Sequence, residues 1–264
     1  MNWAQMDQAA RDAAYNNSAA VPDGPARIEE LRLLSAEVRA AAPGELDQPY
    51  GARERERVDV FDSQPGAPCL VFLHGGYWQR NSREGFAALM DGVRAHGWAA
   101  ALPGYTLAPE ATLTQIVSEV RAALDWVGRR MKGPLILAGW SAGGHLVASA
   151  LDHPRVTAGL AISGVFDLLP IRDTYLNDKL RLSDAEVELL SPLRQPPPPK
   201  PLVLAYGTEE LSALVADSRA LHRRREDAGV PGRLLPLPGH DHFSILEELR
   251  SPTGALTLAA RTLA

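Results

Sequence analysis

A serine lies between glycines in the segment Gly139–Gly143, which reads GWSAG. It follows an apolar run at 135–138 and precedes a helix-capable stretch at 144–152. A strand–turn–helix arrangement of this kind exposes the serine oxygen on a tight turn, which small flanking residues permit. The pattern predicts Ser141 as a nucleophile, with the amide of Ala142 at the helix N-terminus placed to stabilise a developing oxyanion.

A serine hydroxyl becomes nucleophilic when a base takes its proton, and an acid must hold that base in one tautomer. For a serine on such a turn, the acid and then the histidine are expected to follow along the chain. Two histidines, His240 and His242, lie in a loop after the apolar run at 233–237. We favour His242 as the base because it immediately precedes the apolar helix start at Phe243; His240 is the alternative.

The acid is expected in the loop after the preceding apolar run, at 201–206. There the sequence reads Gly207-Thr208-Glu209-Glu210, and either glutamate also suits the N-terminal dipole of the helix that follows. Counting three residues on from the glycine selects Glu210. Glu209 stays an alternative, and Asp217 is a more distant one.

A second motif, HGGYW at 74–78, follows the apolar run at 69–73. Glycines directly after a strand allow the backbone to turn its amides toward a ligand. This loop lies upstream of the serine turn and is expected to supply oxyanion donors that complement Ala142. We interpret His74 and Gly75 as residues that hold the shape of the loop, because they belong to the segment that donates hydrogen bonds.

The elements that must position these residues alternate along the chain. Short apolar runs are separated by segments with helical spacing of apolar residues, and the runs lie at 69–73, 98–102, 135–138, 156–162, 201–206 and 233–237. Strands buried on both faces have unbroken apolar sequences, and their alternation with helices implies right-handed crossovers. The predicted fold class is α/β, with a mostly parallel central sheet and helices on both faces.

Three segments depart from this alternation. Residues 1–50 have apolar residues at helical spacing up to Pro43-Gly44, which predicts an N-terminal helical extension packed on the main body. The charge-alternating segment 53–61 predicts an exposed edge strand. Residues 167–200 contain a polar, helix-like insertion that ends in a stiff proline connector, and we expect a small lid near the carboxyl ends of the strands.

The overall composition favours a single domain over residues 1–264, with 45% apolar and 22% charged residues, as in ordinary globular proteins. A net charge of −5 argues against nucleic acid or an anionic membrane as a partner, because both require clustered positive charge. We expect a small-molecule substrate and no metal or cofactor. A homodimer is an assembly that the sequence leaves open.

Cys69 is the single cysteine, so an intramolecular disulfide is excluded, and its apolar surroundings favour a buried core thiol. The first residues lack the positive and apolar regions of a secretory signal. No stretch approaches the roughly 20 apolar residues that span a bilayer. We therefore expect a soluble, cytoplasmic protein.

Taken together, these segments resemble the kynurenine formamidase (arylformamidase) family of α/β-hydrolases, near the hormone-sensitive-lipase-like esterases. The resemblance implies oxyanion amides from Gly76 and Tyr77 together with Ala142, since the lipase relatives carry a third glycine where this chain has Tyr77. One departure is Glu210, which stands where the family usually has aspartate. The matching segments extend over most of the chain: Tyr15–Asn17, Val21–Asp23, HGGYW at 74–78, Gly104–Glu110, the serine turn and Asp241–Ile245.

The chemistry that this resemblance implies is acyl transfer from an N-acyl aromatic amide, namely hydrolysis of N-formyl-L-kynurenine to L-kynurenine and formate in tryptophan catabolism. A carboxylesterase acting on short-chain acyl esters is the alternative. A non-catalytic, ligand-binding version of the fold is a minor one. The candidate walls of the substrate pocket are the aromatic residues Tyr77, Trp78, Phe166 and Tyr175.

Overall fold

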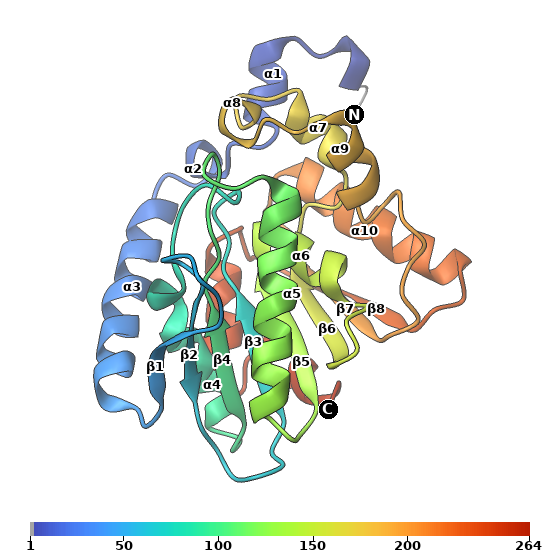
Figure 1. The fold of residues 1–264 in the computed structure, drawn as a ribbon. Coiled ribbons are helices and arrows are strands. Elements are labelled where there is room, and N and C mark those ends of the chain that lie inside the picture. Colours follow the sequence, from blue (N-terminus) through green and yellow to red (C-terminus); the bar gives the residue numbers. More distant parts are fainter. Residues whose placement is uncertain (1–2) are drawn as a thin grey trace.

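The computed structural model describes residues 3–264 and is built around one eight-stranded sheet with the order β1-β2-β4-β3-β5-β6-β7-β8 (Figure 1). β2 is antiparallel to both its neighbours, whereas β4, β3 and β5 to β8 are all parallel. The predicted α/β class with a mostly parallel sheet is confirmed. The strands are β1 Glu45–Pro49, β2 Arg57–Phe61, β3 Cys69–Leu73, β4 Ala99–Pro103, β5 Leu135–Trp140, β6 Val156–Ile162, β7 Leu202–Gly207 and β8 Gly232–Leu237.

Helices cover both faces of the sheet (Figure 1). They are η1 Trp3–Gln5, α1 Gln8–Ala13, α2 Asn17–Ala20, α3 Gly24–Ala41, η2 Arg83–Met90, α4 Asp91–Arg94, α5 Leu113–Arg130, α6 Ala142–Ala150, α7 Leu168–Arg172, α8 Asn177–Leu180, α9 Asp184–Leu190, α10 Ser212–Asp227, η3 Ser244–Leu246, α11 Glu247–Arg250 and α12 Ala255–Arg261.

Successive side chains of a strand point to opposite faces, so each central strand contributes to two cores. In β3, Val71 and Leu73 pack in the core beneath α5, α6 and α10, while Leu70 and Phe72 pack in the core beneath α3, η2 and α12. Cys69, the first residue of β3, is fully buried. Burial on both faces explains why the central strands have unbroken apolar sequences.

The edge of the sheet differs from the expectation for segments 1–50 and 53–61. Residues Glu45–Pro49 form a strand, and this strand covers β2, which is therefore an interior strand. Asp59 in β2 is fully buried, and the guanidinium groups of Arg39 and Arg83 lie 2.8 and 3.3 Å from its carboxylate. A buried carboxylate is tolerated when it is paired in this way. The alternating charges thus include an internal ion-pair cluster.

The insertion and the first helices lie together beyond the carboxyl ends of the parallel strands, where Figure 1 shows α1 beside α7 and α8. The Trp3 indole donates to Asp173 at 3.0 Å, and the Tyr175 amide donates to the Asp12 carboxylate at 2.8 Å. These bonds join two segments that are distant in sequence. Because parallel strands end at the same edge of a sheet, the loops after β3, β5, β7 and β8 meet beneath this pair of segments.

Candidate active site

Ser141 occupies a strained turn between β5 and α6. Its φ and ψ angles are 57° and −119°, a combination that residues with a side chain rarely adopt. The flanking glycines are required sterically: a Cβ on Gly143 would overlap the carbonyl oxygen of Leu73, and a Cβ on Gly139 would overlap that of Gly143. The small residues of the motif therefore allow the turn to pack against β3.

His242 lies against Glu210, and both side chains are buried. The distance between His242 Nδ1 and Glu210 Oε2 is 2.9 Å. The other carboxylate oxygen, Oε1, accepts bonds from the Ser163 hydroxyl and the Gly207 amide, each at 2.6 Å. An ionised carboxylate only accepts hydrogen bonds, so Nδ1 of His242 carries the proton and Nε2 keeps a free lone pair. The imidazole is thus in the tautomer that a general base needs.

The alternative candidates for base and acid, His240, Glu209 and Asp217, do not contact the His242–Glu210 pair through a hydrogen bond within residues 3–264. His240 Nε2 lies 3.4 Å from Glu248, and the Glu209 side chain is exposed. Asp217 is buried and accepts bonds from two backbone amides, and burial raises its pKa to about 7. Of the two neighbouring glutamates and the two neighbouring histidines, the structure brings together Glu210 and His242.

Trp140 contributes a contact that sequence reasoning missed. Its indole Nε1 donates to the backbone carbonyl of His242 at 2.8 Å, and the two rings lie 5.0 Å apart. The residue before Ser141 therefore also positions the loop that carries His242. Ser141 and His242 line one cavity, although no hydrogen bond joins their side chains within residues 3–264. Such bonds are often long before substrate binds.

The HGGYW loop turns back on itself after β3. Gly76 has φ 118°, and Tyr77 and Trp78 have φ 50° and 57°. The carbonyl of Gly76 accepts the amides of Gln79 and Arg80, each at 3.0 Å, which closes the turn. Within residues 3–264, the amides of Gly76 and Tyr77, like that of Ala142, have no backbone acceptor. Three N–H groups therefore stay available at the carboxyl edge of the sheet.

His74 and Gly75 contact the loop itself. His74 Nδ1 lies 2.9 Å from the Gly75 carbonyl oxygen, and Asn81 Nδ2 donates to the same oxygen at 3.0 Å. The His74 ring stacks on Tyr105 with centroids 4.3 Å apart. Burial lowers the pKa of His74 to about 4, so the ring is neutral. A Cβ on Gly75 would lie 2.6 Å from the ring of Trp140, which leaves room for glycine alone.

The aromatic residues expected as pocket walls fall into two groups. Tyr77 and Tyr175 line the cavity of about 190 Å³ that contains Ser141. Trp78 and Phe166 are fully buried and do not line it, which differs from the expectation. Trp78 packs edge-on against His145 with centroids 5.0 Å apart, and Phe166 packs over Gly164. Both rings belong to the core beneath α5 and α6.

The N-terminal segment forms another wall of the cavity. The hydroxyl of Tyr77 donates to the carbonyl of Tyr15 at 2.7 Å and accepts a bond from Asn17 at 3.0 Å. These bonds hold Asn16, Asn17 and Ser18 against the cavity, which they line. Sequence reasoning matched the Tyr15–Asn17 segment to a family without assigning it a role, and it gave no indication of Ser163 or Asn81.

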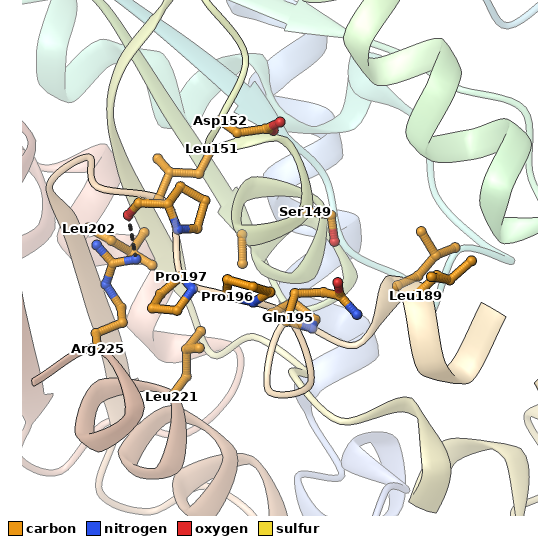
Figure 2. Close-up of a pocket in the computed structure, with 14 residues that line it drawn as sticks. Ser149, Leu151, Asp152, Leu189, Gln195, Pro196, Pro197, Leu202, Leu221 and Arg225 are labelled. Carbon is orange, nitrogen blue, oxygen red and sulfur yellow. Dashed lines mark hydrogen bonds between the residues drawn. The ribbon is translucent and has the colours of Figure 1, made fainter. Parts of the chain in front are cut away.

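A second cavity, of about 320 Å³, lies between α6, α9, α10 and the proline connector (Figure 2). Figure 2 shows Arg225 beside Pro197 and Leu221. The buried guanidinium donates to the carbonyls of Pro198, Lys200 and Pro231, at 3.3, 2.6 and 2.7 Å. Burial lowers the pKa of Arg225 to about 10. These contacts fasten the connector to α10.

None of the helices in the described chain combines the length and apolarity that crossing a bilayer requires. Within residues 3–264, no group of three or more histidine, cysteine, aspartate or glutamate side chains is arranged to hold a metal ion.

The turn after β5 within this sheet is the architecture of an α/β hydrolase, and residues 70–191 match the family model described as alpha/beta hydrolase fold. A kynurenine formamidase from Salmo salar is 30% identical over 84% of this chain and 82% of its own. One from Danio rerio is 29% identical over 88% and 86%. The chain belongs to the kynurenine formamidase family and is a hydrolase.

Further similarities extend to esterases. Esterase LipC of Mycobacterium tuberculosis is 25% identical over 80% of this chain and 62% of its own. A crystal structure from Silicibacter sp. TM1040, provisionally assigned as a thioesterase, has a TM-score of 0.86 at 28% identity and covers 95% of this chain and 98% of that one. The chain thus resembles both proteins named formamidases and proteins named esterases or thioesterases.

Proposed function

We propose that this chain is an arylformamidase that hydrolyses N-formyl-L-kynurenine to L-kynurenine and formate, with Ser141 as nucleophile. The observation that carries the proposal is the contact of His242 with Glu210 beside the cavity of Ser141, in a chain whose relatives are named kynurenine formamidases. A nucleophile, a base and an acid in this arrangement perform acyl transfer on unrelated folds.

The first half-reaction forms a formyl-enzyme. His242 Nε2 takes the proton of Ser141 as Oγ attacks the formyl carbon. The carbonyl oxygen gains negative charge, which the amides of Gly76, Tyr77 and Ala142 stabilise. His242 then passes the proton to the aryl nitrogen, the C–N bond breaks and L-kynurenine leaves. An aryl amine is less basic than an alkyl amine, so it is expelled more readily.

The second half-reaction repeats the cycle with water. His242 takes a proton from water as the water oxygen attacks the formyl carbon of the ester on Ser141. The Oγ–C bond breaks, Ser141 regains its proton from His242, and formic acid leaves and releases its proton to solvent as formate. Throughout, the Glu210 carboxylate keeps Nδ1 protonated and stabilises the imidazolium that forms in each step.

Steady-state kinetics test the proposal. We expect turnover of N-formyl-L-kynurenine, with a kcat/KM at least equal to the values for p-nitrophenyl acetate and p-nitrophenyl butyrate. The formamidase function fails if the formamide is not hydrolysed while an ester is. Each assay includes Ser141→Ala, whose circular dichroism spectrum and thermal unfolding verify that the fold is retained.

A carboxylesterase on short-chain acyl esters is the second candidate. The similarity to Esterase LipC favours it, and the same side chains and amides suit an ester carbonyl. The two candidates differ in the leaving group: an alkoxide or phenoxide requires less help from His242 as an acid than an amine does. The ratio of kcat/KM between formamide and ester therefore separates them.

The cellular setting is part of the same proposal. We place the enzyme in the cytoplasm, where a buried thiol such as Cys69 stays reduced. A homodimer is the assembly to test first, by size-exclusion chromatography with light scattering across a range of protein concentrations. A mass of one chain at every concentration would contradict a dimer.

A further inference from the structure

The cavity of Ser141 has an uneven distribution of charge. Its titratable lining residues are Tyr77, Arg80, Tyr175 and His242, and no aspartate or glutamate among the described residues lines it. His242 is hydrogen-bonded to Glu210, and Arg80 is the one described residue of this lining with a permanent positive charge. A cavity with a fixed positive charge and no carboxylate of its own attracts a negatively charged substituent.

Arg80 also differs from the arginines near it. Arg83 pairs with the buried Asp59, and Arg55 donates to the backbone carbonyls of Tyr105 and Asn81. The Arg80 side chain is exposed, and within residues 3–264 no hydrogen bond or ion pair occupies it. Its five N–H donors are therefore free to bind a ligand.

The backbone fixes Arg80 relative to the reacting serine. The Arg80 amide donates to the carbonyl of Gly76 at 3.0 Å, so the turn that presents the Gly76 and Tyr77 amides also presents this side chain. The neighbouring Gln79 donates to the Leu176 carbonyl at 2.8 Å, which joins the turn to the insertion. A shift of the Arg80 backbone would consequently require a shift of the whole loop.

The guanidinium lies near the aromatic walls of the cavity. Burial raises the pKa of the Tyr77 and Tyr175 phenols, and the positive charge of Arg80 opposes that rise at both groups. Tyr175 is 39% exposed and comes from the insertion, whereas Arg80 comes from the loop after β3. The two side chains thus line the cavity from different segments.

We infer that Arg80 is a specificity-determining residue that binds a carboxylate at the end of the substrate remote from the scissile bond. A guanidinium pairs with a carboxylate through two parallel hydrogen bonds, which fixes orientation as well as adding affinity. In N-formyl-L-kynurenine the α-carboxylate lies at the far end of the side chain from the formamide. The inference rests on the proposed function of the Ser141 site and specifies the substrates that this site prefers.

The test compares a carboxylate-bearing formamide with a neutral one. N-formyl-L-kynurenine and formanilide are assayed with wild type, Arg80→Met and Arg80→Lys, and with Arg129→Met, an exposed arginine at the far end of α5, as matched control. A charge-assisted pair is worth enough to raise KM about tenfold when it is removed. We expect that rise for Arg80→Met on N-formyl-L-kynurenine, with kcat nearly unchanged because the contact is equal in ground and transition states.

The controls exclude a merely structural role. Formanilide should be hydrolysed equally by all four proteins, and Arg80→Lys should restore part of the lost affinity. Raising ionic strength from about 0.05 to about 0.5 M should increase the KM of wild type for N-formyl-L-kynurenine but leave that of Arg80→Met unchanged, because salt screens an exposed pair. Equal losses on both substrates, or no loss on either, would overturn the inference.

Failure of the proposed function would give a different result. If wild type hydrolyses neither formamide, the same proteins are assayed on 4-acetoxybenzoate and phenyl acetate, which differ by a carboxylate on the leaving group. A KM increase confined to 4-acetoxybenzoate in Arg80→Met would then support the carboxylate site in an esterase. If wild type hydrolyses none of the four compounds, both the function and the inference are overturned.

Discussion

Arg80 and Arg225 each line a cavity, but the two guanidinium groups differ in exposure and in hydrogen bonding. Arg225 is 2% exposed and donates to three backbone carbonyls, so its hydrogen bonds hold the proline connector (Figure 2). Arg80 is exposed and lines the same cavity as Ser141, near the amides of Gly76 and Tyr77, for which the described residues provide no backbone acceptor. The smaller cavity, with its free backbone amides and exposed guanidinium, is the one suited to a ligand, whereas in the larger cavity two guanidinium nitrogens of Arg225 are already bound to backbone carbonyls.

The largest expected effect on activity is at Ser141, in the smaller cavity. Replacing Ser141 by alanine removes the attacking oxygen while leaving the turn intact, so we expect kcat to fall by roughly 10⁵-fold or more. The free energy of unfolding should not decrease, because the strained turn loses only a hydroxyl. Assay of formate release measures the loss, and residual activity above a few per cent would contradict the assignment of the nucleophile.

The two neighbouring glutamates provide the next test. Glu210→Gln places an amide against His242 and disturbs its tautomer, and we expect kcat to fall roughly 10³- to 10⁴-fold. Glu209→Gln is the matched control, since that side chain is exposed and should change kcat by less than about twofold. A larger fall in kcat for Glu209→Gln than for Glu210→Gln would assign the role of the acid to Glu209.

Replacement of Arg225 tests the larger cavity. Arg225→Met leaves three carbonyls without a donor, and we expect the free energy of unfolding to fall by about 2–4 kcal/mol, with kcat/KM unchanged. Urea unfolding followed by tryptophan fluorescence measures the stability, with the exposed neighbour Arg223→Met as control. A loss of activity in folded Arg225→Met would show that the second cavity is coupled to Ser141.

Asp217 has the smallest expected effect, on the pH dependence of stability. Burial raises its folded-state pKa from 3.8 to about 7, so the folded chain holds this proton more tightly than the unfolded chain does. Its contribution to stability is therefore largest at low pH and is lost as pH rises through about 7. The free energy of unfolding of Asp217→Asn minus that of wild type, measured by urea titration, should be larger at pH 8 than at pH 5. An equal difference at both pH values would contradict this.

Local sequence was sufficient where local sterics decide the structure. The run Cys69–Leu73 matches β3 residue for residue, and the glycines around Ser141 are those that the turn requires. The choice of Glu210 over its neighbour rested on spacing alone. In the structure, the bond from the Gly207 amide to Glu210 shows why that spacing orients the carboxylate toward His242.

Contacts between distant segments explain what local sequence could not predict. The alternating charges at 53–61 indicated an exposed edge because the partners of Asp59, Arg39 and Arg83, come from other elements. Trp78 and Phe166 resembled pocket walls because an aromatic side chain serves a core and a binding site equally well. Only tertiary packing distinguishes them from Tyr175, which reaches the cavity from the insertion.

The wall of the cavity that contains Ser141 has a consequence for the order of events during translation. Asn16 and Asn17 contribute to it from one part of the chain, and His242 and Phe243 contribute from a part synthesised more than two hundred residues later. A growing polypeptide that has left the ribosome only as far as β7 contains the proposed nucleophile, Ser141, but not the proposed base, His242. Such a nascent chain cannot hydrolyse a substrate by the proposed mechanism, so activity would arise only when the chain has been synthesised at least as far as His242.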